Sequence, residues 1–250
     1  MIPKTIHYCW FGRNPLPDDA LKCIASWRRH MPEYEIIEWN EDNFDVNICP
    51  YTQKAYEEKK YAFVSDYARF WILYNYGGLY FDTDVELIKS LSDIVAKGAY
   101  IGIEKSQATK TVNPTGWVGI NPGLGIGAEK GNAVYGDILQ KYNGMTFDID
   151  GGTVVKHTTD VFTKYGFDGK NHIQEVGHIT VYPDNYFCPM DSTTGIVRIS
   201  PDTYSIHHYS CSWMNRNSLR FKFHLLKNRL IKIFGEKSVI SVSRFLKLSK

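Results

Sequence analysis

The sequence lacks several features that would assign a protein to a class at once. It has five cysteines, an odd number with no CxxC pair, so neither a disulfide framework nor a zinc site is expected and a reducing compartment is favoured. It contains no run of about 18 apolar residues, which a transmembrane helix would need. Its first residues, MIPKTIHYCWFG, show no basic segment followed by an apolar stretch, so no signal peptide is expected.

Charge is unevenly distributed along the 250 residues. The net charge is +2, yet the last 35 residues contain ten lysines and arginines and one glutamate, giving a tail of +9 and a body of −7. We expect one globular domain over residues 1–215 and a separate basic tail over 216–250. No known nucleic-acid reader motif accompanies the basic residues, and the body is acidic, so nucleic-acid binding is not expected.

Hydrophobic periodicity predicts alternating strands and helices, and therefore an α/β fold. The opening order is strand, helix, strand, which predicts a parallel sheet with a nucleotide site near the carboxyl ends of its strands. Expected strands are Lys4–Cys9, Tyr34–Trp39, Leu79–Val85, Ala99–Glu104, Gly123–Ala128, His178–Val181 and Tyr204–Tyr209. Expected helices are Asp18–His30, Thr52–Lys60, Ala62–Tyr76, Asn132–Tyr142 and Val154–Tyr165.

The first candidate site is Asp82-Thr83-Asp84, directly after the apolar run Leu79–Phe81. On a strand, residues two apart point to the same side, so both carboxylates are expected to project together. Carboxylate oxygens suit Mn²⁺ or Mg²⁺, and such an ion can bridge a diphosphate and stabilise it as a leaving group. A lone D-x-D also occurs by chance at acidic strand ends, so the motif needs support from other residues.

A second candidate lies in the preceding helix. Asp66 and Arg69 are three residues apart and share one helix face. An ion pair on a solvated face would explain them, but their helix leads through Gly77-Gly78 directly into the strand before Asp82. Both interpretations stay open.

A third candidate is the pair His207 and His208 in a short expected strand. Alternation sends their side chains to opposite faces, so at most one is expected to ligate a metal beside Asp82 and Asp84. An imidazole beside two carboxylates is a sound Mn²⁺ ligand set. Trp10 follows the first strand, where it would either stack on a nucleobase or belong to the core.

Three stretches together resemble glycosyltransferase family 32: Ile2–Gly12 (IPKTIHYCWFG), Phe63–Val85 (FVSDYARFWILYNYGGLYFDTDV) and His207–Trp213 (HHYSCSW). The family contains DXD-motif sugar transferases of bacterial surface polysaccharides and yeast Golgi mannosyltransferases, and is related to the large clostridial glucosylating toxins. SDxxR followed by YGGxYxDxD is a highly specific match. The resemblance implies a GT-A type catalytic domain over residues 1–215, with a Rossmann-like central sheet flanked by helices, and a helical C-terminal tail.

The resemblance also implies a metal site. Asp84 would be the principal ligand, and Asp82 would help to hold the ion while contacting the ribose or the sugar. His208, or else His207, would complete the site. Mn²⁺ is the expected ion, with Mg²⁺ as the alternative.

Donor contacts follow from the same resemblance. Asp66 and Arg69 would hold hydroxyl groups of the donor sugar, and Tyr80 would lie near the donor. Trp10 would stack on the base, and Trp213 would contact the leaving diphosphate. A UDP-sugar is the preferred donor, with GDP-mannose still open, and retention at the anomeric carbon is expected.

The expected acceptor is a glycan or a polyprenyl-linked oligosaccharide in the synthesis of capsule, O-antigen or exopolysaccharide. Many relatives carry Gly-Pro where this chain has Gly151-Gly152-Thr153, a region expected to face the acceptor. In the basic tail, Leu219, Phe223, Leu226, Leu230 and Phe234 approximate an apolar stripe. The tail would lie on an anionic membrane surface, making the protein cytoplasmic and peripheral to the cell membrane, or would pack on the body.

Two other protein classes share features with this sequence. A haloacid-dehalogenase-like phosphatase also uses D-x-D, but its motif normally continues DxDx[TV], whereas Val85 is followed here by Glu86. A catalytically silent sugar- or lipid-binding relative would keep the fold and lose the site. The intact acidic motif, Asp66, Arg69 and the histidine pair argue against that loss.

Overall fold

The structure is a computed structural model that describes residues 1–106, 117–191 and 195–209. Its strands are β1 (Thr5–Cys9), β2 (Glu35–Trp39), β3 (Gly78–Tyr80), β4 (Val85–Leu87), β5 (Tyr100–Ser106), β6 (Trp117–Asn121), β7 (Ile126–Ala128), β8 (Gln174–Val176), β9 (Ile179–Tyr182) and β10 (Ser205–His207). Its helices are α1 (Asp18–His30), α2 (Pro50–Glu57), α3 (Tyr61–Tyr76), α4 (Ser92–Val95), α5 (Ala133–Asn143), α6 (Val154–Lys164) and α7 (Asp184–Phe187), with a 3-10 turn over Pro122–Leu124.

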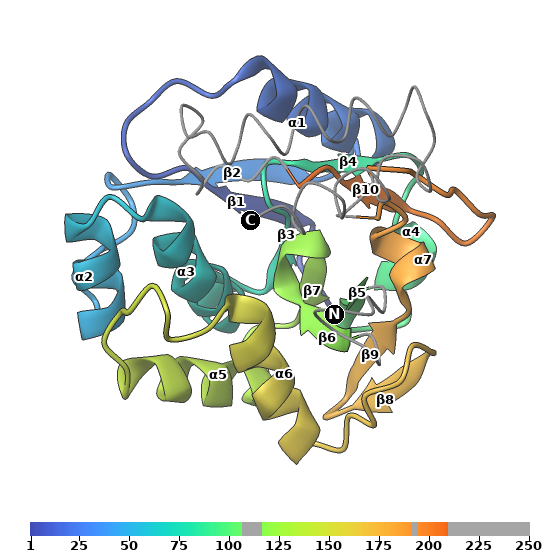
Figure 1. Cartoon of the computed structure of the whole chain (residues 1–250). Helices are drawn as coiled ribbons and strands as arrows, with labels where there is room; N and C mark the ends of the chain where they lie inside the picture. Colours follow the sequence, from blue (N-terminus) through green and yellow to red (C-terminus); the bar gives the residue numbers. More distant parts are fainter. Residues whose placement is uncertain (107–116, 192–194, 210–250) are drawn as a thin grey trace, which may run out of the picture.

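A mixed eight-stranded sheet forms the centre of the molecule (Figure 1). Seven strands follow the order β2-β1-β3-β7-β5-β9-β8, and β6 pairs with β5. β1 is parallel to both β2 and β3, as the strand-helix-strand opening predicts, whereas β7 is antiparallel to β3. Because β1 and β3 run in the same direction, the residues that follow them meet at one edge of the sheet.

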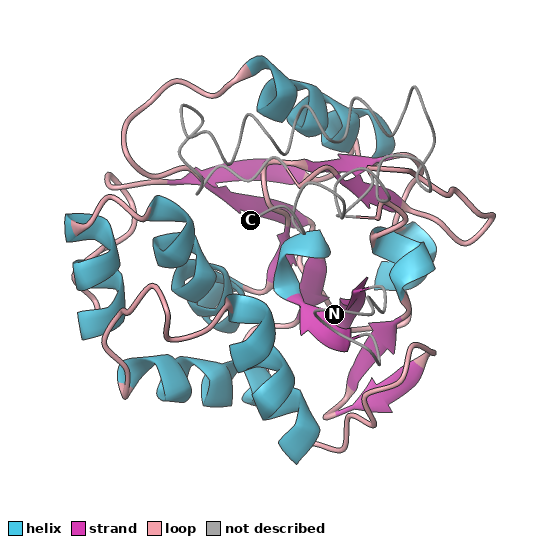
Figure 2. Ribbon diagram, viewed as in Figure 1, coloured by secondary structure: helices cyan, strands magenta, loops and turns pink. Residues whose placement is uncertain are grey.

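Helices cover both faces of this sheet (Figure 2). Side chains alternate between the faces: Leu79 and Tyr100 pack in the cluster that includes α1, whereas Tyr80 and Ile101 pack in the cluster that includes α3. The first cluster also contains residues of α4 and α7, and the second contains residues of α2, α5 and α6. The expected α/β class, with a central sheet flanked by helices, is confirmed. The expected tail over 216–250, its helical content and the boundary after residue 215 lie outside the described residues.

Helix boundaries follow local signals. α1 begins with Asp18 and Asp19 and ends with basic residues, which suits the helix dipole, and it buries Ile24 and Trp27 against the sheet. α3 ends at Gly77, whose φ of 69° places it in a conformation that favours glycine. The next residue, Gly78, has no room for a side chain, because a Cβ there would lie 2.7 Å from the carbonyl oxygen of Thr5.

Two expected strands differ from the structure. The strand expected over Leu79–Val85 divides into β3 and β4, and the residues between them form a turn closed by a hydrogen bond from Val85 N to Asp82 O. The strand expected over Gly123–Ala128 is a 3-10 turn followed by the short β7. A polar turn interrupts the first of these apolar runs, and proline and glycine interrupt the second. Hydrophobic periodicity alone does not detect such an interruption.

A buried histidine connects the first strands to the end of α3. The imidazole of His7 accepts a hydrogen bond at Nδ1 from the indole of Trp39, at 3.0 Å. Its Nε2 lies 3.0 Å from the carbonyl oxygen of Gly77, so the Nε2 tautomer donates there. Burial lowers the pKa of His7 to about 4, so the ring is neutral.

Within the described ranges, no helix is both long enough and apolar enough to cross a membrane. The four cysteines in these ranges, Cys9, Cys23, Cys49 and Cys188, are buried free thiols. Cys211 lies outside the described residues.

Candidate active site

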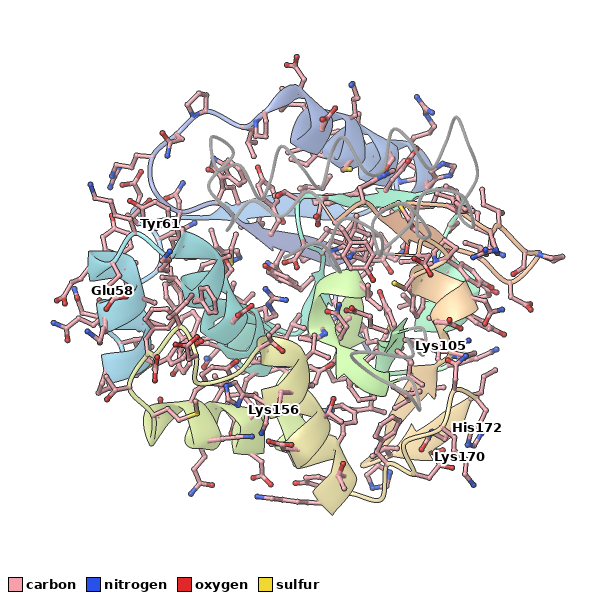
Figure 3. The ribbon with its side chains drawn as sticks, in the orientation of Figure 1. Glu58, Tyr61, Lys105, Lys156, Lys170 and His172 are labelled. Atoms are coloured by element: carbon pink, nitrogen blue, oxygen red, sulfur yellow. The ribbon has the colours of Figure 1, made fainter. Side chains whose placement is uncertain are left out.

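A cleft of about 840 Å³ lies at the edge of the sheet where β1 and β3 end. Residues following these two strands line it, together with the start of α3, parts of β5 and β6, the segment Ile149–Val155 and the end of β10. Tyr61 marks the start of α3 beside Glu58 (Figure 3). The volume is in the range of sites that take drug-sized ligands.

Asp82 and Asp84 both line this cleft. They come together because they flank a turn, and the strand alternation that predicted their proximity does not produce it. The prediction that the two carboxylates lie close together is therefore right, but the predicted reason, alternation along a strand, is wrong. A turn also presents backbone atoms here: the Asp84 carbonyl oxygen accepts a hydrogen bond from His208 N at 2.9 Å.

The late strand β10 carries the histidines to this turn. It pairs antiparallel with β4, in a register that sets His207 opposite Val85. His207 Nε2 lies 3.2 Å from Asp84 Oδ1, and ligand atoms of Asp82, Asp84 and His207 all lie within 4.8 Å of one another. His208 points away, as alternation predicts, and its Nε2 lies 2.8 Å from the carboxylate of Glu86. The position of His208 thus does not support its preference as ligand; His207 is the histidine beside the aspartates.

The three candidate ligands are largely enclosed. The side chains of His207, Asp84 and Asp82 are 11%, 16% and 28% exposed. Burial alone would lower the pKa of His207, but the charge of Asp84 and the hydrogen bond to it raise that pKa to about 9. Burial raises the pKa of Asp82, which the positive charge of Arg69 opposes. A cation placed among these groups would stabilise both carboxylates in their charged form.

The donor set fits the expected ions. Two carboxylate oxygens and one imidazole nitrogen suit Mn²⁺, and the oxygens suit Mg²⁺. Three protein ligands leave further coordination positions for oxygens of a diphosphate. The ligand atoms of Asp82, Asp84 and His207 already lie within 4.8 Å of one another, so these three side chains could hold a divalent ion.

Asp66 and Arg69 form a buried pair, so the interpretation as a solvated surface pair is wrong. Arg69 Nη2 lies 2.8 Å from Asp66 Oδ1 and 3.2 Å from Asp82 Oδ1, and its side chain is only 3% exposed. Its Nε donates to the carbonyl oxygen of Ser65 at 3.1 Å. Burial raises the pKa of Asp66 to about 7, although Arg69 opposes this shift. Arg69 therefore joins the helix to the acidic turn, and Asp66 lines the cleft beside it.

Tyr80 lies behind the acidic turn. It is 1% exposed, and its hydroxyl donates to Asp82 Oδ1 at 3.0 Å. The guanidinium carbon of Arg69 lies 5.1 Å from the centre of its ring. Tyr80 thus orients Asp82 from the protein side.

Trp10 is half-buried: it lines the cleft and also packs against the core cluster that includes α1, so its stacking on a nucleobase stays a prediction. Its indole donates to the carbonyl oxygen of Asn14 at 2.6 Å. Nearby, Gly12 has a φ of 95°, and a Cβ there would lie 2.3 Å from the ring of Tyr61. Trp10 and Tyr61 both line the cleft. Trp213 lies outside the described residues.

Three residues of the site were missed from the sequence. Glu104 on β5 and Asn121 at the end of β6 line the cleft and are hydrogen-bonded to each other. Gly123 lies against Asp82, because a Cβ there would be 2.3 Å from Asp82 Oδ2. The available signal was the turn Asn121-Pro122-Gly123 after an apolar strand. No local signal in the sequence marks Glu104, because the pairing of its strand with other strands brings it to the site.

Residues 17–101 match the family described as glycosyltransferase sugar-binding region containing DXD motif. Inositol phosphoceramide mannosyltransferase 3 of Schizosaccharomyces pombe (strain 972 / ATCC 24843) is 30% identical over 104 residues, which are 40% of this chain and 29% of that protein. Inositol phosphoceramide mannosyltransferase 1 of the same organism is 28% identical over 111 residues, which are 40% of this chain and 33% of that protein. The chain thus matches about a third of the length of these two relatives.

The uncharacterized glycosyltransferase L373 of Acanthamoeba polyphaga mimivirus is 25% identical over 224 residues, covering 85% of this chain and 84% of that protein. Among solved structures, a glycosyltransferase involved in glycosylation of the major capsid of PBCV-1 is 11% identical, with a TM-score of 0.47, covering 90% of this chain and all of that one. The PaToxG glycosyltransferase is 17% identical, with a TM-score of 0.46, covering 65% and 69%. The expected resemblance to DXD-motif glycosyltransferases is confirmed by the family match over residues 17–101 and by the curated relatives.

Proposed function

We propose that this chain is a metal-dependent glycosyltransferase that moves a hexose from a nucleotide-sugar donor to a glycan or a lipid-linked oligosaccharide. The observation that carries the proposal is the meeting of Asp82, Asp84 and His207 within 4.8 Å in a cleft that Trp10 also lines. The glycosyltransferase sugar-binding region over residues 17–101 supports the same reaction class.

Different residues of the cleft are proposed to bind the metal ion and the nucleobase of the donor. Asp82, Asp84 and His207 would hold Mn²⁺ or Mg²⁺. When bound, such an ion would stabilise the charge that develops on the leaving nucleoside diphosphate. Trp10, which lines the same cleft, would stack on the nucleobase. Arg69 fixes the carboxylate of Asp82.

Asp66 and Arg69 are proposed to act at the donor sugar. Asp66 lines the cleft and has an oxygen that is not committed to the 2.8 Å contact with Arg69. Carboxylate and guanidinium groups hydrogen-bond hydroxyls well. We propose retention of the anomeric configuration by front-face displacement, in which the leaving phosphate oxygen helps to deprotonate the acceptor hydroxyl. Trapping a covalent glycosyl-enzyme on a carboxylate would contradict this mechanism.

The proposed donor is a UDP-sugar. Two relatives are named inositol phosphoceramide mannosyltransferases, so mannose donors and lipid acceptors should also be assayed. The basic tail favours an anionic membrane surface, and an acceptor on a polyprenyl carrier at the inner face of a cell membrane would fit surface-polysaccharide synthesis. Deleting residues 216–250 should abolish binding to liposomes that contain anionic lipid. Unchanged binding would contradict the membrane proposal.

A donor-hydrolysis screen tests the enzyme class. The purified protein is incubated with Mn²⁺, Mg²⁺ or a chelator and a panel of UDP- and GDP-sugars, and released nucleoside diphosphate is measured. We expect release from one donor, dependent on the ion and lost in Asp84→Asn. Asp168→Asn, an exposed carboxylate outside the cleft, is the matched control and should retain release.

Absence of release from every donor, together with absence of nucleotide-induced thermal stabilisation, would reject the proposal. That result would favour a catalytically silent sugar- or lipid-binding protein. Stabilisation by nucleoside diphosphate without release from any donor would instead indicate a missing acceptor or a donor outside the panel.

A further inference from the structure

Glu104 is a half-buried carboxylate in the wall of the cleft. It lies on β5, away from the D-x-D turn in sequence, and it is not one of the three clustered metal-ligating groups. Among the described residues, no lysine or arginine forms an ion pair with it. The charge of the His207 imidazole opposes the rise in the pKa of Glu104 that burial causes, but an enclosed carboxylate also needs hydrogen-bond donors for its oxygens.

Asn121 holds this carboxylate in one orientation. The amide of Asn121 donates from Nδ2 to Glu104 Oε2 at 2.5 Å, and its Oδ1 accepts from the backbone N–H of Gly123 at 2.7 Å. The second bond fixes which end of the amide faces Glu104. A carboxylate has about four acceptor sites. Asn121 uses one, so Glu104 keeps acceptor capacity toward the cleft.

The same residues connect Glu104 to the acidic turn. Gly123 lies so close to Asp82 that a Cβ would be 2.3 Å from Asp82 Oδ2. Glu104 and Asp82 are therefore joined through Asn121 and Gly123 by one hydrogen bond, a two-residue turn and one close packing contact. A sugar attached to a diphosphate at Asp82 and Asp84 would lie within reach of this wall.

We infer that Glu104 accepts a hydrogen bond from a hydroxyl group of the donor sugar, and that Asn121 is its positioning residue. The inference rests on the proposed glycosyl transfer. Glu104 lines the same cleft as the acidic turn, which would hold the donor's diphosphate. A carboxylate that keeps free acceptor positions suits the hydroxyls of a neutral hexose and repels the carboxylate of a uronic acid.

The test compares two ligands that differ only in the sugar. Affinities for UDP and for the UDP-sugar identified in the screen, or for GDP and GDP-mannose, are measured by calorimetry with Mn²⁺ for the wild type, Glu104→Ala and Glu104→Gln. We expect Glu104→Ala to weaken nucleotide-sugar binding about tenfold or more and to leave nucleoside diphosphate affinity unchanged. Glu104→Gln preserves the shape and one acceptor, so its loss should be smaller.

Glu175→Gln is the matched control, because Glu175 lies exposed on β8 outside the cleft. Equal affinities of wild type and Glu104→Ala for the nucleotide sugar would overturn the inference. Parallel weakening of both ligands would also overturn it, since the effect would then lie at the phosphates or in folding. A wild type that binds neither ligand would reject the proposed function itself.

Discussion

Arg69 and Asp82 face each other across 3.2 Å, the guanidinium on α3 and the carboxylate in the turn after β3. The same guanidinium lies 2.8 Å from Asp66, so one buried cation serves a buried and a half-buried carboxylate. The SDxxR segment and the D-x-D motif therefore form one electrostatic unit. Its geometry places Asp82 before any metal or donor binds.

Replacing Arg69 should destabilise the fold. Arg69→Met leaves two enclosed carboxylates without their cation, and removing one partner of a buried pair costs about 3–5 kcal/mol of unfolding free energy. Urea unfolding followed by tryptophan fluorescence measures the loss. Arg13→Met removes an exposed arginine paired with Asp42 at 2.7 Å and should leave the unfolding midpoint near that of the wild type. Equal midpoints for both variants would contradict the buried role of Arg69.

The two histidines should separate in metal binding. His207→Ala removes a candidate ligand, so we expect Mn²⁺ affinity to fall at least about tenfold. Replacing a residue that only orients a metal ligand already lowers metal affinity by about this factor. His208→Ala removes a contact with Glu86 on the surface and should keep Mn²⁺ affinity. Calorimetric titration with Mn²⁺ measures both. A larger loss in His208→Ala would show that the ligand is the other histidine.

Gly123 should not tolerate a side chain. A Cβ would lie 2.3 Å from Asp82 Oδ2, so Gly123→Ala must displace the carboxylate or the turn. We expect weaker Mn²⁺ binding and a loss of about 1–3 kcal/mol in unfolding free energy from overpacking. Gly144→Ala is the control, because the nearest atom to its Cβ would be 3.6 Å away, which is ordinary contact. Unchanged metal affinity together with an unchanged unfolding free energy would contradict the close contact between Gly123 and Asp82.

Acid should weaken the fold through His7. Burial lowers its pKa from 6.5 to about 4, so between these values the unfolded chain binds a proton that the folded chain does not. Stability therefore falls as the pH decreases through this window. His7→Gln keeps a donor and an acceptor near Trp39 and Gly77 but does not titrate.

Urea unfolding at about pH 7 and about pH 5 measures this linkage. The decrease in unfolding free energy on acidification should be smaller in His7→Gln than in the wild type. Identical decreases would show that His7 is protonated equally in both states, and hence that it is not held as a neutral ring.

Local signals in the sequence determined much of the scaffold. Acidic and basic ends bounded α1, and a pair of glycines ended α3, because capping and the helix dipole act within one turn of the chain. The strand-helix-strand order determined the parallel pairing of β1 with β2. The acidic motif and SDxxR were recognisable because their chemistry depends on short spacing. Both motifs lie inside the family match over residues 17–101.

Only the tertiary structure decided how these pieces meet. The choice of His207 depends on the register of β10 against β4, two strands about 120 residues apart, and a shift of one residue would present His208 instead. The burial of Arg69 and the position of Glu104 likewise depend on contacts that no local pattern contains. Register, close packing at glycine and shared burial are long-range properties, so the sequence alone identified the acidic motif, while the fold selected its partners.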